Sequence, residues 1–133
     1  MPTNTAATAA RQTHLQVPHS IRKTITFETA ADTEIGTLPA GAVIDPALSS
    51  VLIKTAFNAA TTNTIDVGTA ADDNLYATAL AAGSVARVPF DEFTASNVLS
   101  ADTTLTVTYD QSGTAATAGE AEVVVVYHVD NDG

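Results

Sequence analysis

The sequence predicts an all-β protein, an antiparallel β-sandwich of jelly-roll-like architecture with an extended N-terminal arm. Apolar runs of strand length recur roughly every 8–15 residues, with turn-forming residues between them. Ala and Thr fill 47 of the 133 positions, yet the larger apolar residues do not follow helical spacing. No internal repeat of fixed period is present, so neither a solenoid nor a propeller is expected.

Residues 1–20 are expected to form the arm, and residues 21–133 the sandwich domain. The first segment has no hydrophobic periodicity and contains Pro2 and Pro18. It opens the basic end of the chain, because three of the five Lys and Arg residues precede the first acid, Glu28. The residues expected to make contacts for the arm are Arg11, His14, His19, Arg22 and Lys23.

The first half of the domain predicts three strands. Residues 24–28 alternate Ile25 and Phe27 with polar side chains, which is the pattern of a half-buried strand. Residues 38–45 contain a Pro-Ala-Gly turn that leads into a short strand. Residues 51–57 place Val, Ile, Thr and Phe on one face and Leu, Lys and Ala on the other, so this strand is nearly apolar on both faces.

The middle of the chain predicts shorter elements. Ile65 and Val67 point inward from a short strand that Gly68 closes, and a polar loop with an adjacent pair of exposed aspartates follows. Residues 75–84 are the one stretch that could make a helical turn. Pro89 then indicates a sheet edge or a strand end, since proline cannot donate a ladder hydrogen bond.

Two longer strands are expected near the C-terminus. Residues 103–110 alternate large apolar side chains with threonines, and residues 111–120 are rich in Gly, Thr and Ala, which indicates a flexible, hairpin-like connection. Residues 120–130 follow with Val at positions 123–126 and then Tyr127. A strand with one wet face should alternate apolar and polar residues, so both faces of this last strand need cover.

Two arrangements could cover the second face of that strand. If Val123 and Val125 enter the core, Val124 and Val126 form an apolar stripe on the opposite face, which must meet another sheet, another subunit or another protein. A domain of about 110 residues is small for covering both faces by itself. A subunit contact is therefore favoured over a strand covered wholly within the monomer. The expected interface residues are Val124, Val126 and Leu52.

Charge and composition argue against several classes of function. The chain carries five Lys and Arg against fifteen Asp and Glu, a formal net charge of −10. Nucleic-acid backbones and anionic membranes are bound by basic surfaces, so neither partner is expected. Cysteine is absent, which leaves no disulfide or thiolate metal site. No signal-peptide pattern or membrane-spanning run is recognisable, so a soluble chain made in the cytoplasm is expected.

No constellation for catalysis or metal binding is apparent. His14 and His19 lie in the predicted arm and His128 lies in the last strand, without a nucleophile to activate. Residues 130–133 resemble the opening of a calcium loop but lack the later ligands, so a solvated tail is expected. The chain is accordingly predicted to be no enzyme and to hold no metal or cofactor.

Binding of carbohydrate, a common use of small β-sandwiches, usually needs exposed aromatic side chains. Tryptophan is absent, and only Phe90 and Phe93 form a pair that could be displayed. Packing in the core or in an interface is the favoured role for both.

The phrases "PAG", "TAFN", "TIDVG", "TAADDNLY", "LTVTYD" and "EVVVVYHV", spread over about residues 35–129, resemble small virion proteins of tailed bacteriophages. The resemblance implies a structural component of the particle, a capsid decoration (cement) protein on the capsid exterior, as a dimer or trimer bound to the major capsid protein. Head-fibre, neck or tail components are alternatives of the same class, and a sugar-binding adhesion module is one from another class. The resemblance transfers no individual binding residue.

The basic arm suggests how such a protein would attach. An arm that becomes ordered on binding can lie in an acidic groove between capsid subunits. An oligomer with two or three arms would then bind multivalently, since each later arm attaches at high effective concentration.

Overall fold

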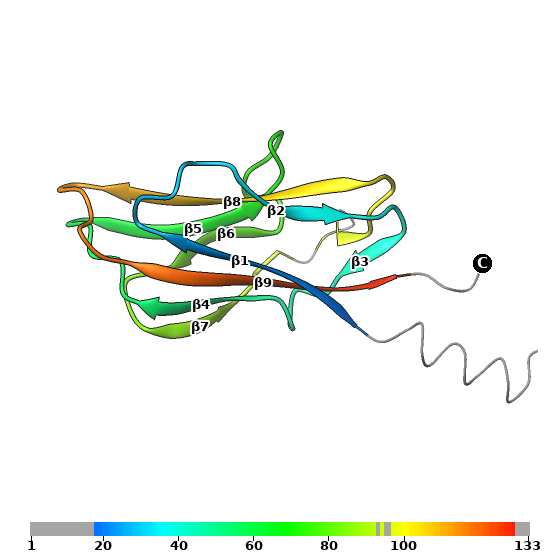
Figure 1. The fold of residues 1–133 in the computed structure, drawn as a ribbon, viewed down its shortest axis with the longest axis horizontal. Helices are drawn as coiled ribbons and strands as arrows, with labels where there is room; N and C mark the ends of the chain where they lie inside the picture. The colour runs from blue at the N-terminus through cyan, green and yellow to red at the C-terminus, as the bar shows by residue number, and fades with distance from the viewer. Residues whose placement is uncertain (1–17, 93, 95–96, 130–133) are drawn as a thin grey trace, which may run out of the picture.

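The structure, a computed structural model, describes residues 18–92, 94 and 97–129, and this part of the chain is built from strands without an α-helix. Two antiparallel sheets face each other, which confirms the predicted all-β sandwich (Figure 1). The strands are β1 (His19–Thr26), β2 (Thr33–Leu38), β3 (Ala42–Ile44), β4 (Ser50–Thr55), β5 (Thr62–Gly68), β6 (Ala77–Ala81), β7 (Ala86–Pro89), β8 (Thr103–Ser112) and β9 (Glu120–Val129).

The strand order is that of a jelly roll. One sheet, here called the β9 sheet, has the order β1-β9-β4-β7, and β3 also pairs with β9. The other, the β8 sheet, has the order β2-β8-β5-β6. β3 and β4 pair with successive parts of the same edge of β9, so together they replace one strand. With β3 and β4 counted as one strand, every connection except β5–β6 crosses between the sheets, as in a jelly roll.

The core lies between the two sheets and confirms most of the predicted inward positions. Thr55 is an exception, because a register shift after Ile53 leaves it exposed. The ring of Phe57 packs against Tyr109 with 4.4 Å between centroids, and the Tyr109 hydroxyl donates to Asn63 Oδ1 at 2.6 Å. The largest fully buried side chains are Ile25, Leu38, Ile44, Val51, Phe57, Ile65, Val67, Tyr76, Leu105, Val107, Val123 and Val125.

Two strands differ from the sequence prediction. Residues 77–81, expected as a possible helical turn, form β6: a register shift opposite β5 and a φ of 51° at Ala79 break the strand alternation. Ala77 and Leu80, three residues apart, are therefore both buried, which mimics helical spacing. β2 was not predicted, since a bulge between Glu34 and Gly36 disrupts its pattern.

The connection over residues 111–120 is also not the predicted hairpin, because β8 and β9 belong to different sheets. It crosses one end of the sandwich, where Asn58 Oδ1 accepts hydrogen bonds from the backbone N–H groups of Thr117 and Ala118 at 2.8 and 3.0 Å. Gly119 has a φ of 151°, and a Cβ there would lie 2.5 Å from the Phe57 ring. Glycine is needed at this position because the backbone passes directly over that ring.

The position of Pro89 agrees with its sequence prediction. β7 ends at Pro89 and forms an edge of the β9 sheet, as the proline indicated. β1 begins at His19, two residues before the predicted start of the domain. Across the described ranges, no helix long and apolar enough to cross a bilayer was found.

Candidate functional site

The two faces of β9 differ in the way that its unbroken valine run suggested. Val123 and Val125 are fully buried in the core. Val124 and Val126 lie on the outer face of the β9 sheet and are half-buried. The neighbours of Val124 in the ladder are Arg22 of β1 on one side and Ser50 of β4 on the other. An apolar stripe therefore runs along the centre of this outer face.

Leu52, the third predicted interface residue, lies on the same face. It is half-buried and pairs with Glu122 of β9 on one side and with Arg87 of β7 on the other. Val124 is two residues along β9 from Glu122, so Leu52 adjoins the stripe diagonally. The structure thus brings the three predicted interface residues onto one face, and the subunit contact itself stays a prediction.

A short loop between β3 and β4 enlarges the apolar face, and sequence analysis did not single it out. In this Asp45–Ser49 loop, Leu48 is 50% exposed. Val43 of β3 is 39% exposed and forms an isolated bridge with Val98, which is 58% exposed. The only sequence signal for the loop was Asp-Pro, which favours a turn.

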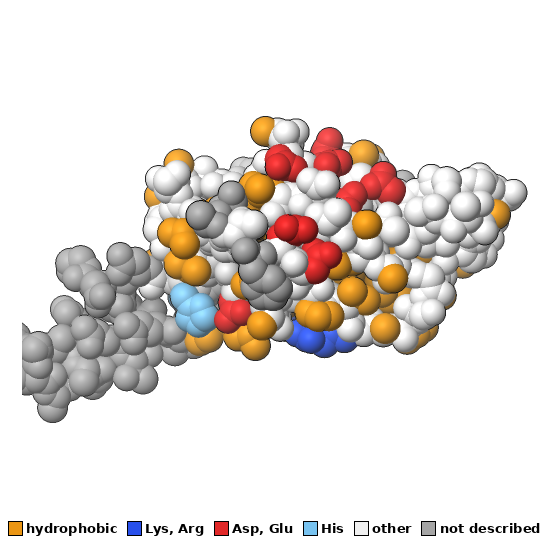
Figure 2. Space-filling view, turned by 180° about the vertical axis from the view of Figure 1, so that it is seen from behind, with side chains coloured by type: hydrophobic (Ala, Val, Ile, Leu, Met, Phe, Trp, Pro, Cys, Tyr) orange, Lys and Arg blue, Asp and Glu red, His pale blue; other side chains and the backbone are white. Residues whose placement is uncertain are grey.

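Charge is divided unequally between the two sheets. All four Lys and Arg residues of the described ranges lie in strands of the β9 sheet. The charged residues in the strands of the β8 sheet are all Asp or Glu. Figure 2 shows one face of the molecule on which carboxylates gather above and Lys or Arg lies at the lower edge. The basic residues are Arg22, Lys23, Lys54 and Arg87, and the strand acids of the β8 sheet are Glu34, Asp66 and Asp110.

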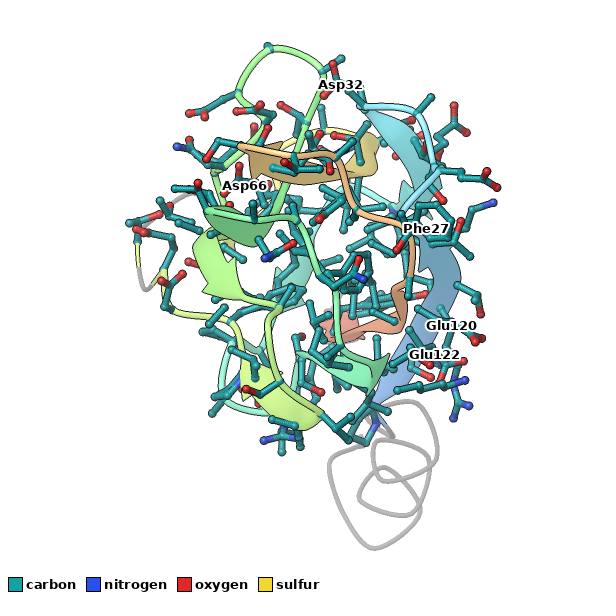
Figure 3. The ribbon with its side chains drawn as sticks, turned by 90° about the vertical axis from the view of Figure 1, so that its left-hand side faces the viewer. Phe27, Asp32, Asp66, Glu120 and Glu122 are labelled. Carbon is teal, nitrogen blue, oxygen red and sulfur yellow. The ribbon has the colours of Figure 1, made fainter. Side chains whose placement is uncertain are left out.

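The β9 sheet carries acids as well. Glu120 and Glu122 stand side by side at the start of β9, next to β1, and Asp66 lies on the opposite side of the sandwich (Figure 3). Glu122 pairs with Thr24 of β1 and Glu120 with Thr26. The outer face of this sheet therefore offers apolar, acidic and basic groups close together.

The structure fixes three of the five residues that were assigned to arm contacts. His19, Arg22 and Lys23 are all in β1, and the His19 ring lies 5.5 Å from the ring of Tyr127. Their positions are set by the ladder between β1 and β9 rather than by a free arm. The other two, Arg11 and His14, lie outside the described residues.

Asp66 of β5 is a buried carboxylic acid that sequence analysis did not identify. Its side chain is 9% exposed, and its Oδ1 accepts a hydrogen bond from the Ala79 N–H at 2.6 Å. Burial, followed by a hydrogen bond with Asp110, raises the pKa of Asp66 from 3.8 to about 6, and the charges of Asp110 and Asp73 add to this rise. The group therefore titrates close to neutral pH.

In the described part of the chain, Asp66 belongs to no group of side chains that could hold a metal ion. Within the ranges that the structure describes, no three His, Cys, Asp or Glu side chains are arranged to hold a metal ion. Asp72 and Asp73 are exposed, as the sequence predicted, and the loop containing them closes through hydrogen bonds between Thr69 and Asp72.

The remaining residues that the sequence singled out divide between the core and the undescribed segments. Phe90 is 2% exposed, in agreement with its expected role in packing, and Phe93 and residues 130–133 lie outside the described residues. An open hollow of about 280 Å³ lies between the 69–76 and 98–103 segments. Its lining is made of aliphatic residues, hydroxyl residues and Tyr76, without a carboxylate, histidine or basic group.

Comparison with known proteins gives one informative match. No family model matches the chain, and no curated protein matches it either. A chain of a solved structure described as "Cyanophage Pam1 capsid asymmetric unit" has the same fold, with a TM-score of 0.62 and 22% sequence identity. The match covers 86% of each chain, so the two chains are similar in length as well as in fold.

Proposed function

We propose that this chain is a non-enzymatic structural protein of a bacteriophage particle, bound to the outside of the capsid as a decoration (cement) protein. The observation that carries the proposal is the fold shared with a chain of a cyanophage capsid unit over 86% of both chains. A jelly roll alone supports many functions, from lectins to enzymes. The surface of this sandwich must therefore support the proposal too.

The chemistry of the two sheets suits attachment by one side. The outer face of the β9 sheet carries the half-buried stripe of Val124 and Val126, together with Arg22, which pairs with Val124, and Arg87, which pairs with Leu52. On the β8 sheet, Glu34, Thr37 and Asp110 are exposed, whereas Thr106, Thr108 and Asp66 are buried. The β9 sheet is thus the candidate for attachment, because its outer face combines half-buried valines with charged side chains.

Attachment to the major capsid protein is proposed to involve the basic N-terminal region. Arg11 and His14 precede β1, and Arg22 and Lys23 continue the same basic region on the sheet edge. The stripe of Val124 and Val126 with Leu52 would join two or three copies, so that several arms bind one shell. Multivalency would then give tight attachment from weak individual arms.

Immunogold labelling tests the proposal directly. Phage particles would be purified from a lysate of cells that produce the chain. They would then be labelled with antibodies raised against the chain. We expect gold over the whole capsid surface. Label confined to the neck, the tail or fibres would replace the decoration role with one of those components, and particles without the chain would contradict any virion role.

Removing residues 2–17 is expected to abolish binding to capsid shells while the sandwich stays folded. The deletion ends before His19, because β1 begins there and pairs along its length with β9. Binding is measured by co-sedimentation with shells prepared without this protein, and folding by far-ultraviolet circular dichroism and thermal melting. A chain lacking residues 131–133 is the matched control. If the truncated chain still co-sediments, the arm is not the anchor.

A further inference from the structure

We propose that Leu48 anchors the contact between copies of this chain, and that the Asp45–Ser49 loop is a pre-formed knob that presents it. The inference deepens the proposed function, since it rests on self-association through the outer face of the β9 sheet. It names a residue beyond the valine stripe and a structural device that holds this residue in place.

The loop is an interruption in an otherwise continuous line of strand. β3 pairs with residues 127–129 of β9 and β4 with residues 120–124, on the same edge. Between them the chain leaves this line and returns to it, and both ends of the loop bind one residue of β9. The N–H of Asp45 donates to the Val126 carbonyl at 2.9 Å, and Ser49 Oγ accepts from the Val126 N–H at 2.8 Å.

Hydrogen bonds also hold the loop from within and from β7. Asp45 Oδ1 accepts from the N–H groups of Ala47 and Leu48 at 3.1 and 3.3 Å, and the Asp45 carbonyl accepts from Ser49 N–H at 2.9 Å. Arg87 Nη2 donates to the carbonyls of Ala47 and Leu48 at 3.2 and 3.5 Å. The backbone is thereby fixed, yet the Leu48 side chain stays half exposed.

This combination is what an interface anchor requires. A large apolar side chain gains most on binding when it enters a pocket of the partner, and a backbone that is already ordered loses little entropy in doing so. The loop adds residues to the line of strand, because an uninterrupted ladder from the Ile44–Tyr127 pair would place Ala47, and not Ser50, opposite Val124. The loop is accounted for if its side chain packs against a partner.

A second copy of the chain fits the surroundings of Leu48. Ser49 binds the backbone of Val126, so the loop lies beside β9 at one of the two stripe residues. The same face carries Arg22 and Arg87 together with Glu120 and Glu122. A contact that uses one surface twice must be complementary to itself, and a face with both signs of charge meets that condition.

Sedimentation velocity of the full chain over a range of concentrations tests this inference. Replacing Leu48→Ser is expected to raise the dissociation constant for self-association about tenfold or more, with no change in melting temperature. Val85→Ser is the matched control, because Val85 is 70% exposed in the turn before β7 and should not affect association. Arg87→Ala should also weaken association, although Leu48 is retained, because it removes the bonds to the loop.

Two results would overturn the inference. The first is a Leu48→Ser chain that associates as tightly as the wild type, and the second is a wild type that is monomeric at every concentration. If the first result is accompanied by loss of binding to shells, Leu48 belongs to the capsid contact instead. Each leaves the immunogold result unchanged, so failure of this inference is distinguishable from failure of the proposed function.

Discussion

Replacing both Val124 and Val126 with aspartate is expected to abolish the proposed self-association and to leave folded monomers. The two side chains are half-buried on the outer face of the β9 sheet, while Val123 and Val125 fill the core. The substitutions therefore leave the core intact. In the complex they would bury carboxylates at the centre of the contact, where a buried charge without a partner is strongly unfavourable.

The expected effect on association is large. Full burial of a valine contributes about 1.5–3 kcal/mol, and each copy supplies two valines that are only partly covered in the monomer. With the cost of the buried carboxylates added, the dissociation constant should rise by a factor of about 100 or more. Sedimentation velocity would measure the mass, and circular dichroism and thermal melting would establish the fold.

Val124→Thr with Val126→Thr provides the matched control for shape. Threonine keeps the branched side chain and the strand preference of valine but adds a hydroxyl group. This variant should be folded and associate more weakly than the wild type, yet more tightly than the aspartate variant. An aspartate variant with unchanged mass and stability would show that the stripe is not the interface.

The alternation in β9 illustrates what local pattern can predict. Five consecutive apolar residues, Val123 to Tyr127, identified a strand with two apolar faces, and the structure places Val123 and Val125 in the core with Val124 and Val126 opposite. A period of two is a property of the strand backbone, so the division into two faces needs no knowledge of the remaining fold. The pattern does not reveal which partner covers the outer face, because that depends on other molecules.

The elements that were missed depend on contacts between distant segments. β2 and β6 each contain a register shift, and such a bulge changes which residues face inward only once the neighbouring strand is known. The Asp45–Ser49 loop is likewise defined by Val126 and Arg87, which lie about 80 and 40 residues away in the sequence. The local spacing of apolar residues does not reveal these long-range contacts.

Asp66 shows the same dependence for a titratable group. In the sequence it is one of fifteen acids, in a strand between Ile65 and Val67. Its burial follows from the way β5 is flanked by β6 and β8, which bring the Ala79 N–H and the Asp110 carboxyl to it. The pKa shift is therefore a consequence of tertiary structure.

The substitution Asp66→Asn is expected to stabilise the protein at neutral and higher pH and to have little effect in acid. The folded state raises the pKa of Asp66 from 3.8 to about 6, so folding favours the protonated carboxyl. The stability contributed by this proton is fully present below pH 3.8 and is lost as the pH rises through 6. Above that range the wild type must hold a buried carboxylate beside Asp110, whereas asparagine stays neutral.

Thermal melting between pH 4 and pH 8 would measure this effect. The variant should melt several degrees higher than the wild type at pH 8, corresponding to about 1–3 kcal/mol, and the two curves should converge near pH 4. Glu34→Gln is the control, because Glu34 is an exposed acid of the same sheet. The difference in melting temperature between this variant and the wild type should be the same at every pH. The asparagine amide can still accept the Ala79 hydrogen bond, so the sheet geometry is retained. Parallel pH profiles for wild type and Asp66→Asn would mean that the proton on Asp66 does not contribute to folding.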